Sequence, residues 1–441
     1  MASRIIVPRL GVFGFITLAG IAMPALAQEP KMKSFPTAAE TDPVTLGMMQ
    51  GFPPPPDKII RFADGSSSRF PNTRWAFSHI RELVPTANVS RGQGPIVALP
   101  RAERDLSKIA FTTLDGKPLT FNDALALTYT DGILVLHKGK VVFEKYFGAG
   151  DPHRPHIAFS VTKSVVGTLA ALLAADGKLD PAALVTKYVP ELKDSAYGDA
   201  TVRQVMDMTI GVRFSENYSD PNAEVFAYAR AGGLAPIPPN YQGPRSFYDF
   251  LVTLKKEGEH GQEFKYQTSN AEVLAWIVKR ASGQSMAALL SDTIWSKLGT
   301  EHDAYFTVDS IGTASGGGGL NTTLRDLARF GEMMRLHGKF NGQQIIPEAA
   351  VADIEKGGDK DQFAKAGYVL LKGWSYRNMW WITHNDHDAY IARGIYGQSI
   401  YIDPKAEMVI VRYASHPIAG NAANDPISLP MYAAVANELM K

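Results

Sequence analysis

The chain has 441 residues, of which 45% are hydrophobic, and its 45 basic and 44 acidic side chains nearly cancel. This charge balance excludes the basic surface typical of proteins that bind nucleic acids, so we expect no nucleic-acid partner. Cysteine is absent, which excludes disulfides, a thiolate nucleophile and a cysteine-ligated metal.

The N-terminus has the order of a secretory signal peptide. Arg4 and Arg9 flank the start of a short apolar run, residues 10–22, and Ala25-Leu26-Ala27 then offers small residues at the cleavage spacing. A membrane anchor is the alternative, but the run is shorter than the roughly 20 residues needed to cross a bilayer. We therefore expect a signal peptide over residues 1–27, cleavage after Ala27, a periplasmic or secreted protein and no stable membrane insertion.

Residues 28–110 lack a clear helical or strand period and contain four consecutive prolines, residues 53–56. They nevertheless hold several aromatic side chains, such as Trp75 and Phe77, which a disordered tail would not. We predict an N-terminal extension that wraps over a main domain, residues 111–441.

Two β-rich runs, residues 133–136 and 141–147, flank Lys138-Gly139-Lys140 and predict a hairpin. The next stretch has apolar residues at helical spacing from Val161 to Leu172, and Gly177 is a plausible stop. Because this helix is apolar nearly all round, we expect it to be buried.

The following residues, about 186–300, are rich in helical patterns and predict an inserted helical lobe. Further helices are expected over residues 323–337 and 432–440, and a second hairpin over residues 399–402 and 408–413. Hairpins near both ends with helices between them indicate an α+β fold. In it, one antiparallel sheet is built from both ends of the chain and is flanked by helices.

Ser160 and Lys163 form the only Ser-x-x-Lys sequence, at the predicted start of a helix. Residues three apart lie on one helix face, so the lysine amine can reach the serine hydroxyl. A serine needs such a proton acceptor to become a nucleophile, and a lysine can serve if burial lowers its pKa. The alternative is that Ser160 is an N-cap and Lys163 is solvated.

Several stretches elsewhere resemble a known superfamily in the same order. They are RWAFSHIRELVPT (74–86), ENYSDP (216–221), FKYQTSNAEVLAWIVKRASG (264–283), GGGLNTTLRDLARFGEMM (317–334) and ARGIYGQSIYIDP (392–404). With the Ser-x-x-Lys sequence, they resemble the β-lactamase-like, penicillin-binding serine hydrolases, and more closely the 6-aminohexanoate-dimer (nylon-oligomer) hydrolase branch. The resemblance covers most of residues 45–441 and implies the β-lactamase/transpeptidase-like fold.

The resemblance also implies site residues. Ser160 would form an acyl-enzyme, Lys163 and Tyr266 would share the proton transfers, and the backbone amides of Ser160 and Ile395 would form the oxyanion hole. Gln398 is the alternative second amide if the register slides. Tyr266 read as a core tyrosine is another alternative.

Two further residues are expected to bind substrate. Tyr218 matches a position where that branch presents a hydroxyl to the substrate amide, although a packed loop aromatic fits as well. The usual Lys-Thr-Gly triplet is replaced by Ala392-Arg393-Gly394, so Arg393 either binds a substrate carboxylate or is a surface charge. The Tyr-x-Asn of class C enzymes is replaced by Tyr266-Gln267-Thr268. These departures disfavour an efficient β-lactamase.

The remaining motifs point to no other chemistry. His384-Asn385-Asp386-His387 lacks a third ligand and reads as a solvated loop, and residues 316–319 read as a tight turn. We expect no metal and no cofactor. The expected function is a serine amidase or esterase acting on a small-molecule substrate, with linear short amides such as 6-aminohexanoate oligomers, or short-chain esters, as leading substrates. A β-lactamase or DD-peptidase is the alternative, and a catalytically silent penicillin-fold binding protein is the rival of another class.

Overall fold

The computed structural model describes residues 35–217, 220 and 222–441. The predicted signal peptide, residues 1–27, and the predicted substrate residue Tyr218 both lie outside the described residues. Within the described residues, no helix is both long and apolar enough to cross a membrane.

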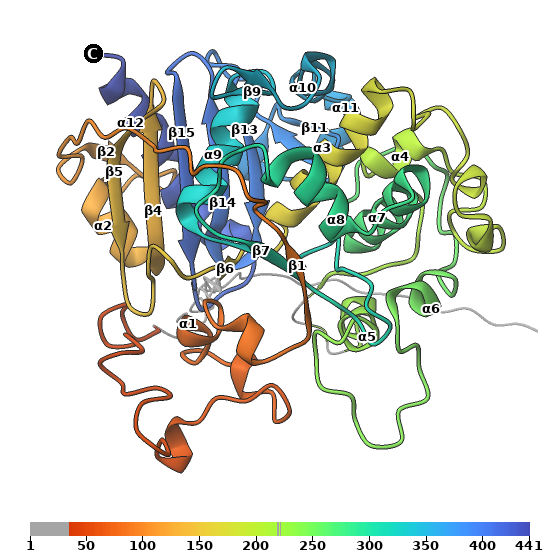
Figure 1. The fold of residues 1–441 in the computed structure, drawn as a ribbon, viewed down its shortest axis with the longest axis horizontal. Coiled ribbons are helices and arrows are strands. Elements are labelled where there is room, and N and C mark those ends of the chain that lie inside the picture. The colour runs from red at the N-terminus through yellow and green to blue at the C-terminus, as the bar shows by residue number, and fades with distance from the viewer. Residues whose placement is uncertain (1–34, 218–219, 221) are drawn as a thin grey trace, which may run out of the picture. The chain divides into compact units, whose positions relative to one another are not determined.

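The described helices and strands follow the chain as shown in Figure 1. The helices are α1 Thr73–Ala76, α2 Phe121–Leu127, α3 Val161–Ala175, α4 Val202–Met206, α5 Glu224–Ala231, α6 Phe247–Leu251, α7 Thr268–Ser282, α8 Met286–Leu290, α9 Leu324–Arg335, α10 Glu348–Glu355, α11 Lys360–Ala364 and α12 Asp425–Leu439. The strands are β1 Thr86–Val89, β2 Ala110–Thr112, β3 Pro118–Thr120, β4 Thr130–His137, β5 Lys140–Tyr146, β6 His156–Ile157, β7 Ala304–Thr307, β8 Leu320–Thr322, β9 Lys339–Phe340, β10 Gln343–Gln344, β11 Ser375–Arg377, β12 Trp380–Ile382, β13 Tyr390–Gly394, β14 Gln398–Asp403 and β15 Met408–Ala414.

The largest sheet among the described residues has seven antiparallel strands in the order β11-β12-β13-β14-β15-β4-β5. Both predicted hairpins lie in it, as β4–β5 and β14–β15, and β15 pairs with β4 although about 270 residues separate them. The prediction of an α+β fold with one antiparallel sheet built from both ends of the chain is therefore confirmed.

Helices cover both faces of this sheet because its strands alternate their side chains. On β14, Ser399 and Tyr401 face α12, where the Ser399 hydroxyl lies 2.7 Å from that of Tyr432. Ile400 points the opposite way, toward Gly331 of α9. The core of the protein therefore has a helix–sheet–helix arrangement (Figure 1).

Helix α3 is held against the sheet by hydrogen bonds as well as by apolar packing. The Ser164 hydroxyl donates to the Met379 carbonyl at 2.7 Å, and the Trp380 indole donates to the Thr168 hydroxyl at 3.1 Å. The helix is buried along most of its length, as its apolar sequence predicted. These bonds leave α3 little freedom to slide, which matters for the side chains at its first turn.

A second, four-stranded sheet of the described residues, in the order β1-β7-β8-β6, connects distant parts of the chain. Strand β1 comes from residues 35–110, which we call the N-terminal segment, and pairs with β7. The Ile157 amide of β6 donates to the Phe77 carbonyl at 2.8 Å, and a buried ion pair joins Arg74 to Asp131 at 3.4 Å. Described residues of the stretch 35–110 therefore contact β4 and β6, which precede α3, and β7, which follows it.

Candidate active site

Ser160 lies at the N-terminal end of α3, directly after β6. Its side chain makes no capping hydrogen bond, so it does not serve as an N-cap of the usual kind. The preceding residue, Phe159, has φ of +45°, a left-handed conformation that costs free energy for a bulky residue. The turn from β6 into α3 is thus strained next to the Ser160 hydroxyl.

Lys163 lies one helical turn after Ser160, and its side chain is only 1% exposed. Its Nζ is 2.8 Å from Ser160 Oγ and 2.6 Å from the Gly317 carbonyl oxygen. Burial lowers the pKa of Lys163 to about 8, against the opposing negative charges of Glu216 and Glu272. A neutral amine can donate to Gly317 while its lone pair faces the Ser160 hydroxyl.

The Gly317 carbonyl is positioned by Glu272 of α7. The Glu272 carboxylate accepts hydrogen bonds from the amides of Gly316 and Gly317, both at 2.8 Å, and from the hydroxyls of Tyr228 and Ser315, at 2.7 and 3.0 Å. Burial raises the pKa of Glu272, and these four donors oppose the rise by stabilising the carboxylate. The predicted tight turn at residues 316–319 is confirmed, but its contact with Lys163 was not foreseen.

Tyr266 lies just before α7 and faces the side chains of Ser160 and Lys163. Lys163 Nζ lies 5.2 Å from the centre of the Tyr266 ring. Burial, followed by the negative charge of Glu216, raises the pKa of Tyr266 far above its usual range, and a hydrogen bond with Ser160 opposes the rise. At neutral pH the Tyr266 side chain is therefore a protonated phenol, which can donate but not accept a proton.

The backbone amides of Ser160 and Ile395 lie beside the same cavity. Among the described residues, neither the Ser160 N–H nor the Ile395 N–H donates to a turn, loop or cap carbonyl. Both residues line one cavity. Backbone amides beside a cavity can donate to an oxyanion that develops there.

This cavity has a volume of about 240 Å³. Its lining is mostly apolar, and among the described residues it includes no carboxylate and no histidine. Lys163 is its one lysine or arginine in that part of the chain. The described lining therefore offers no ligand set for a metal ion.

Three aromatic rings, Phe77, Phe159 and Tyr396, form one wall of the cavity. The Phe77 and Phe159 rings are 4.8 Å apart, and each lies 5.0–5.4 Å from the Tyr396 ring. Tyr396 follows Ile395 and, like Phe159, has a left-handed φ, +64°. Phe77 belongs to the N-terminal segment, so this segment contributes directly to the cavity.

Arg393 has a partner inside the protein. Its guanidinium lies 2.5 and 2.6 Å from the two Asp425 carboxylate oxygens and 4.9 Å from the Trp381 ring centre. The side chain is 5% exposed, so the alternative of a surface charge is wrong. His384 and His387 have separate partners, Ser375 at 2.7 Å and Asp403 at 2.8 Å.

Comparisons with known proteins agree with this geometry. The family described as beta-lactamase matches residues 128–427. The chain is 37% identical over 348 residues to the 6-aminohexanoate-dimer hydrolase of Paenarthrobacter ureafaciens, covering 79% of this chain and 86% of that protein.

Solved structures show the same relationship. One from Bacillus anthracis, assigned provisionally as a 6-aminohexanoate-dimer hydrolase, superposes with a TM-score of 0.78 at 32% identity, covering 85% of this chain and 96% of that one. A D-stereospecific amidohydrolase from Streptomyces shares the fold, with a TM-score of 0.51 at 15% identity over 69% of this chain and 96% of its own. The family match extends from β4 through α3 and the large sheet to the start of α12. The chain therefore belongs to the beta-lactamase family and is a serine hydrolase.

Proposed function

We propose that Ser160 is the nucleophile of an amidase or esterase that works through an acyl-enzyme. The observation that carries this proposal is the 2.8 Å contact between Lys163 Nζ and Ser160 Oγ at the wall of an apolar cavity. With a pKa of about 8, Lys163 is partly neutral near pH 7 and can accept the Ser160 proton as the hydroxyl attacks a carbonyl carbon.

The remaining steps use groups around this pair. The carbonyl oxygen becomes an oxyanion that accepts hydrogen bonds from the Ser160 and Ile395 amides. The Tyr266 phenol donates its proton to the leaving amine or alcohol, and the Lys163 ammonium, which holds the proton taken from Ser160, then returns a proton to the Tyr266 phenolate. Water then attacks the acyl-enzyme, its proton returns through the same groups, and the acid is released with Ser160 regenerated.

The substrate we propose is a linear amide or ester with a short aliphatic acyl chain. Because the described lining of the cavity is largely apolar and has no carboxylate, it suits an aliphatic chain near Ser160. Two relatives carry the name 6-aminohexanoate-dimer hydrolase, which makes 6-aminohexanoate oligomers the leading amides to test. A β-lactamase or DD-peptidase remains the alternative activity.

Two proposed substrate contacts complete the site. Tyr218 would present its hydroxyl to the scissile amide, as its place in ENYSDP suggests. Arg393 would attract a substrate carboxylate, although its pairing with Asp425 weakens the field that it offers. An Arg393 field weakened in this way gives a free β-lactam carboxylate less to bind, and we expect nitrocefin to be a poor substrate.

We further propose that residues 1–27 are a signal peptide cleaved after Ala27, which would take the protein to the periplasm or outside the cell. Residues 28–110 would then be an N-terminal extension, residues 111–441 the hydrolase domain and residues 186–300 its helical lobe. Helices α4–α8, all between residues 202 and 290, are consistent with such a lobe.

A substrate panel tests the proposal: p-nitrophenyl acetate and butyrate, 6-aminohexanoate dimer and nitrocefin, each with the wild type and Ser160→Ala. We expect turnover of the esters and the dimer, weak turnover of nitrocefin, and loss of all activity in the variant. Intact mass should show one acyl group on the wild type and none on Ser160→Ala.

Three results would count against the proposal. Acylation of Ser160→Ala would show that another residue is the nucleophile. Nitrocefin turnover equal to that of the esters would favour the β-lactamase alternative. A wild type that neither turns over nor becomes acylated would support a silent binding protein.

A further inference from the structure

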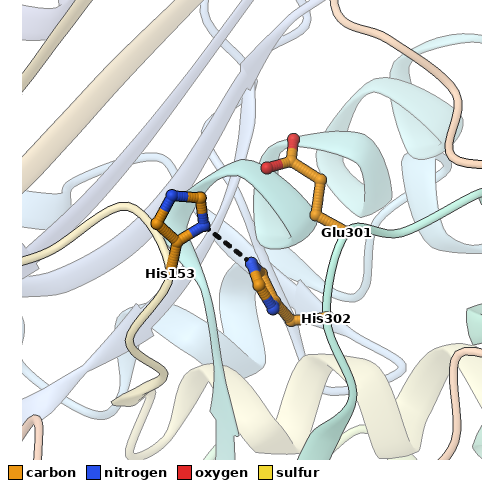
Figure 2. A group of neighbouring side chains, drawn as sticks. All are labelled: His153, Glu301 and His302. Atoms are coloured by element: carbon orange, nitrogen blue, oxygen red, sulfur yellow. Dashed lines mark hydrogen bonds between the residues drawn. The ribbon is translucent and has the colours of Figure 1, made fainter.

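Outside the cavity, two histidines from distant parts of the chain meet at the surface. His153 lies between β5 and β6, and His302 lies just before β7. Their ring nitrogens, His153 Nδ1 and His302 Nε2, are 3.0 Å apart although 149 positions separate the residues. Figure 2 shows the two rings joined through these atoms, with the Glu301 side chain beside them.

We propose that His153, His302 and Glu301 form a binding site for a divalent transition-metal ion, with Zn²⁺ as the ion that fits best. One ligand atom from each of the three side chains lies within 4.8 Å of the others. Two imidazoles and a carboxylate are a ligand set that Zn²⁺ accepts, with water completing the coordination. Because His153 is exposed and the other two are partly exposed, an ion can reach the site from solvent.

The spacing of the histidine nitrogens supports a shared ion. Two nitrogens that each lie about 2.0–2.1 Å from a tetrahedral metal are about 3.3 Å apart. The separation in the structure is 3.0 Å, so small rotations of two partly exposed rings are sufficient. Binding requires that the proton now shared between the two nitrogens leaves, as metal binding to histidine generally does.

The Glu301 carboxylate is already oriented by two arginines. Its Oε1 accepts from Arg329 at 2.8 Å and its Oε2 from Arg325 at 3.3 Å. A carboxylate has about four acceptor positions, so one oxygen can bind an ion while these bonds remain. Metal-bound carboxylates are commonly held by outer hydrogen bonds of this kind.

The charge of the two arginines is balanced by other carboxylates. Arg325 also pairs with Glu144, at 2.6 Å, and Arg329 with Asp326, at 2.9 Å. A cation near Glu301 therefore does not meet two uncompensated positive charges.

The site would stabilise the protein and would not take part in the hydrolysis. None of the three side chains lines the cavity that holds Ser160. An ion there would join the segment that leads into β6 and α3 to the segment that leads into β7. Both segments continue to residues of the cavity wall, Ile157 and Thr307, so metal binding would tighten that end of the fold.

Metal binding to the full-length protein without an affinity tag tests the proposal. We expect one equivalent of Zn²⁺ to bind, measured by competition with a chromogenic chelator, and Co²⁺ to give the visible absorption bands of a tetrahedral site. His153→Gln, His302→Gln and Glu301→Gln should each weaken Zn²⁺ binding at least about 10-fold, the lower end of the loss that follows removal of even an outer partner. The matched control is His337→Gln, because His337 pairs with a single carboxylate, Glu355, at 3.3 Å; this variant should bind Zn²⁺ as the wild type does.

Thermal unfolding gives a second measurement. Zn²⁺ at 100 times its Kd should raise the Tm by about 3 °C for a chain of this size. The rise should disappear in His153→Gln, whose exposed side chain can change without disturbing the fold, and each variant is compared with its own metal-free Tm. Equal Zn²⁺ affinity in the wild type and His153→Gln, or in the wild type and Glu301→Gln, would overturn the three-ligand site.

Discussion

The amine of Lys163 has the Ser160 hydroxyl on one side and the Gly317 carbonyl on the other, and no carboxylate of the described residues forms an ion pair with it. Burial is the main reason that its pKa falls to about 8. Only the neutral amine can take the Ser160 proton, and the neutral fraction grows as the pH rises through the pKa. The protonation of one side chain therefore determines how fast the proposed reaction starts.

We predict that kcat/KM for an ester rises with pH to a plateau, with a midpoint of about 8, the pKa of Lys163. Lys163→Ala should lower the plateau by about 10²- to 10⁴-fold, the usual contribution of a general base. Lys163→Arg should be no better, because a guanidinium stays protonated. A loss smaller than tenfold in Lys163→Ala would show that another group is the base.

Glu272 acts on Lys163 through its charge and through the Gly317 carbonyl. Its negative charge raises the Lys163 pKa, so Glu272→Gln should move the midpoint of the pH profile below that of the wild type. The amide also leaves donors around it without an acceptor, which should lower the free energy of unfolding by about 1–3 kcal/mol. A stability loss with an unchanged midpoint would mean that Glu272 is only structural.

Ser160 and Lys163 lie at the N-terminal end of α3, so a shift of this helix moves both side chains. Gly167 lies where the helix passes close to the turn between β11 and β12, and a Cβ there would be 2.0 Å from the Asn378 carbonyl oxygen. Asn378 cannot easily retreat, since its amide donates to Asp207 at 3.0 Å and its side chain to Asp353 at 2.8 Å. The glycine is therefore needed for close packing, not for an unusual backbone angle.

We predict that Gly167→Ala lowers the free energy of unfolding by about 1–3 kcal/mol, despite the higher helix propensity of alanine. The shift of α3 should also reduce kcat. Gly420→Ala is the control, because Gly420 has φ of −64° and no atom within 4 Å of an added Cβ. Denaturant unfolding and ester kinetics measure both variants, and equal stability would contradict the close contact.

Over the whole molecule, the cavity depends on residues that are far apart in the chain. Phe77 comes from the N-terminal segment, Phe159 precedes α3 and Tyr396 follows β13. Their contacts close the apolar wall beside Ser160. The length of the substrate acyl chain that the enzyme accepts should therefore depend on Phe77 of the N-terminal segment as well as on residues 128–427, which match the family.

We predict that Phe77→Ala enlarges the cavity and shifts the ester preference toward longer acyl chains. It should also cost about 3–5 kcal/mol of stability, as expected for a buried phenylalanine. Phe77→Leu should be more stable than Phe77→Ala and should keep part of the wild-type preference for shorter acyl chains. Phe52→Ala is the matched control, because the Phe52 side chain is fully exposed. If Phe77→Ala kept the acyl-chain preference of the wild type, the aromatic wall would not select the acyl chain.

Local patterns in the sequence predicted several of the elements and one contact of the candidate site, although α12 begins at Asp425, before the expected 432. Alternation and turn residues predicted both hairpins, and helical spacing with the Gly177 stop predicted α3, because these signals act over a few residues. The pairing of Ser160 with Lys163 also followed from spacing, since one helical turn fixes their separation. The assignments of Ser160, Lys163, Tyr266, Ile395, Tyr218 and Arg393 to catalytic roles stay predictions, and the domain boundaries do as well.

Contacts between distant segments were decided only by the tertiary structure. Four such contacts join residues that are 32 or more positions apart. They are Lys163 with Gly317, Glu272 with Gly317, Arg393 with Asp425 and His153 with His302. No local period encodes such contacts, because they arise when apolar faces pack and bring unrelated polar groups together. The sequence alone determined the two hairpins, helix α3 and the one-turn spacing of Ser160 and Lys163, whereas packing determined the burial that lowers the Lys163 pKa and the cavity that the pair faces.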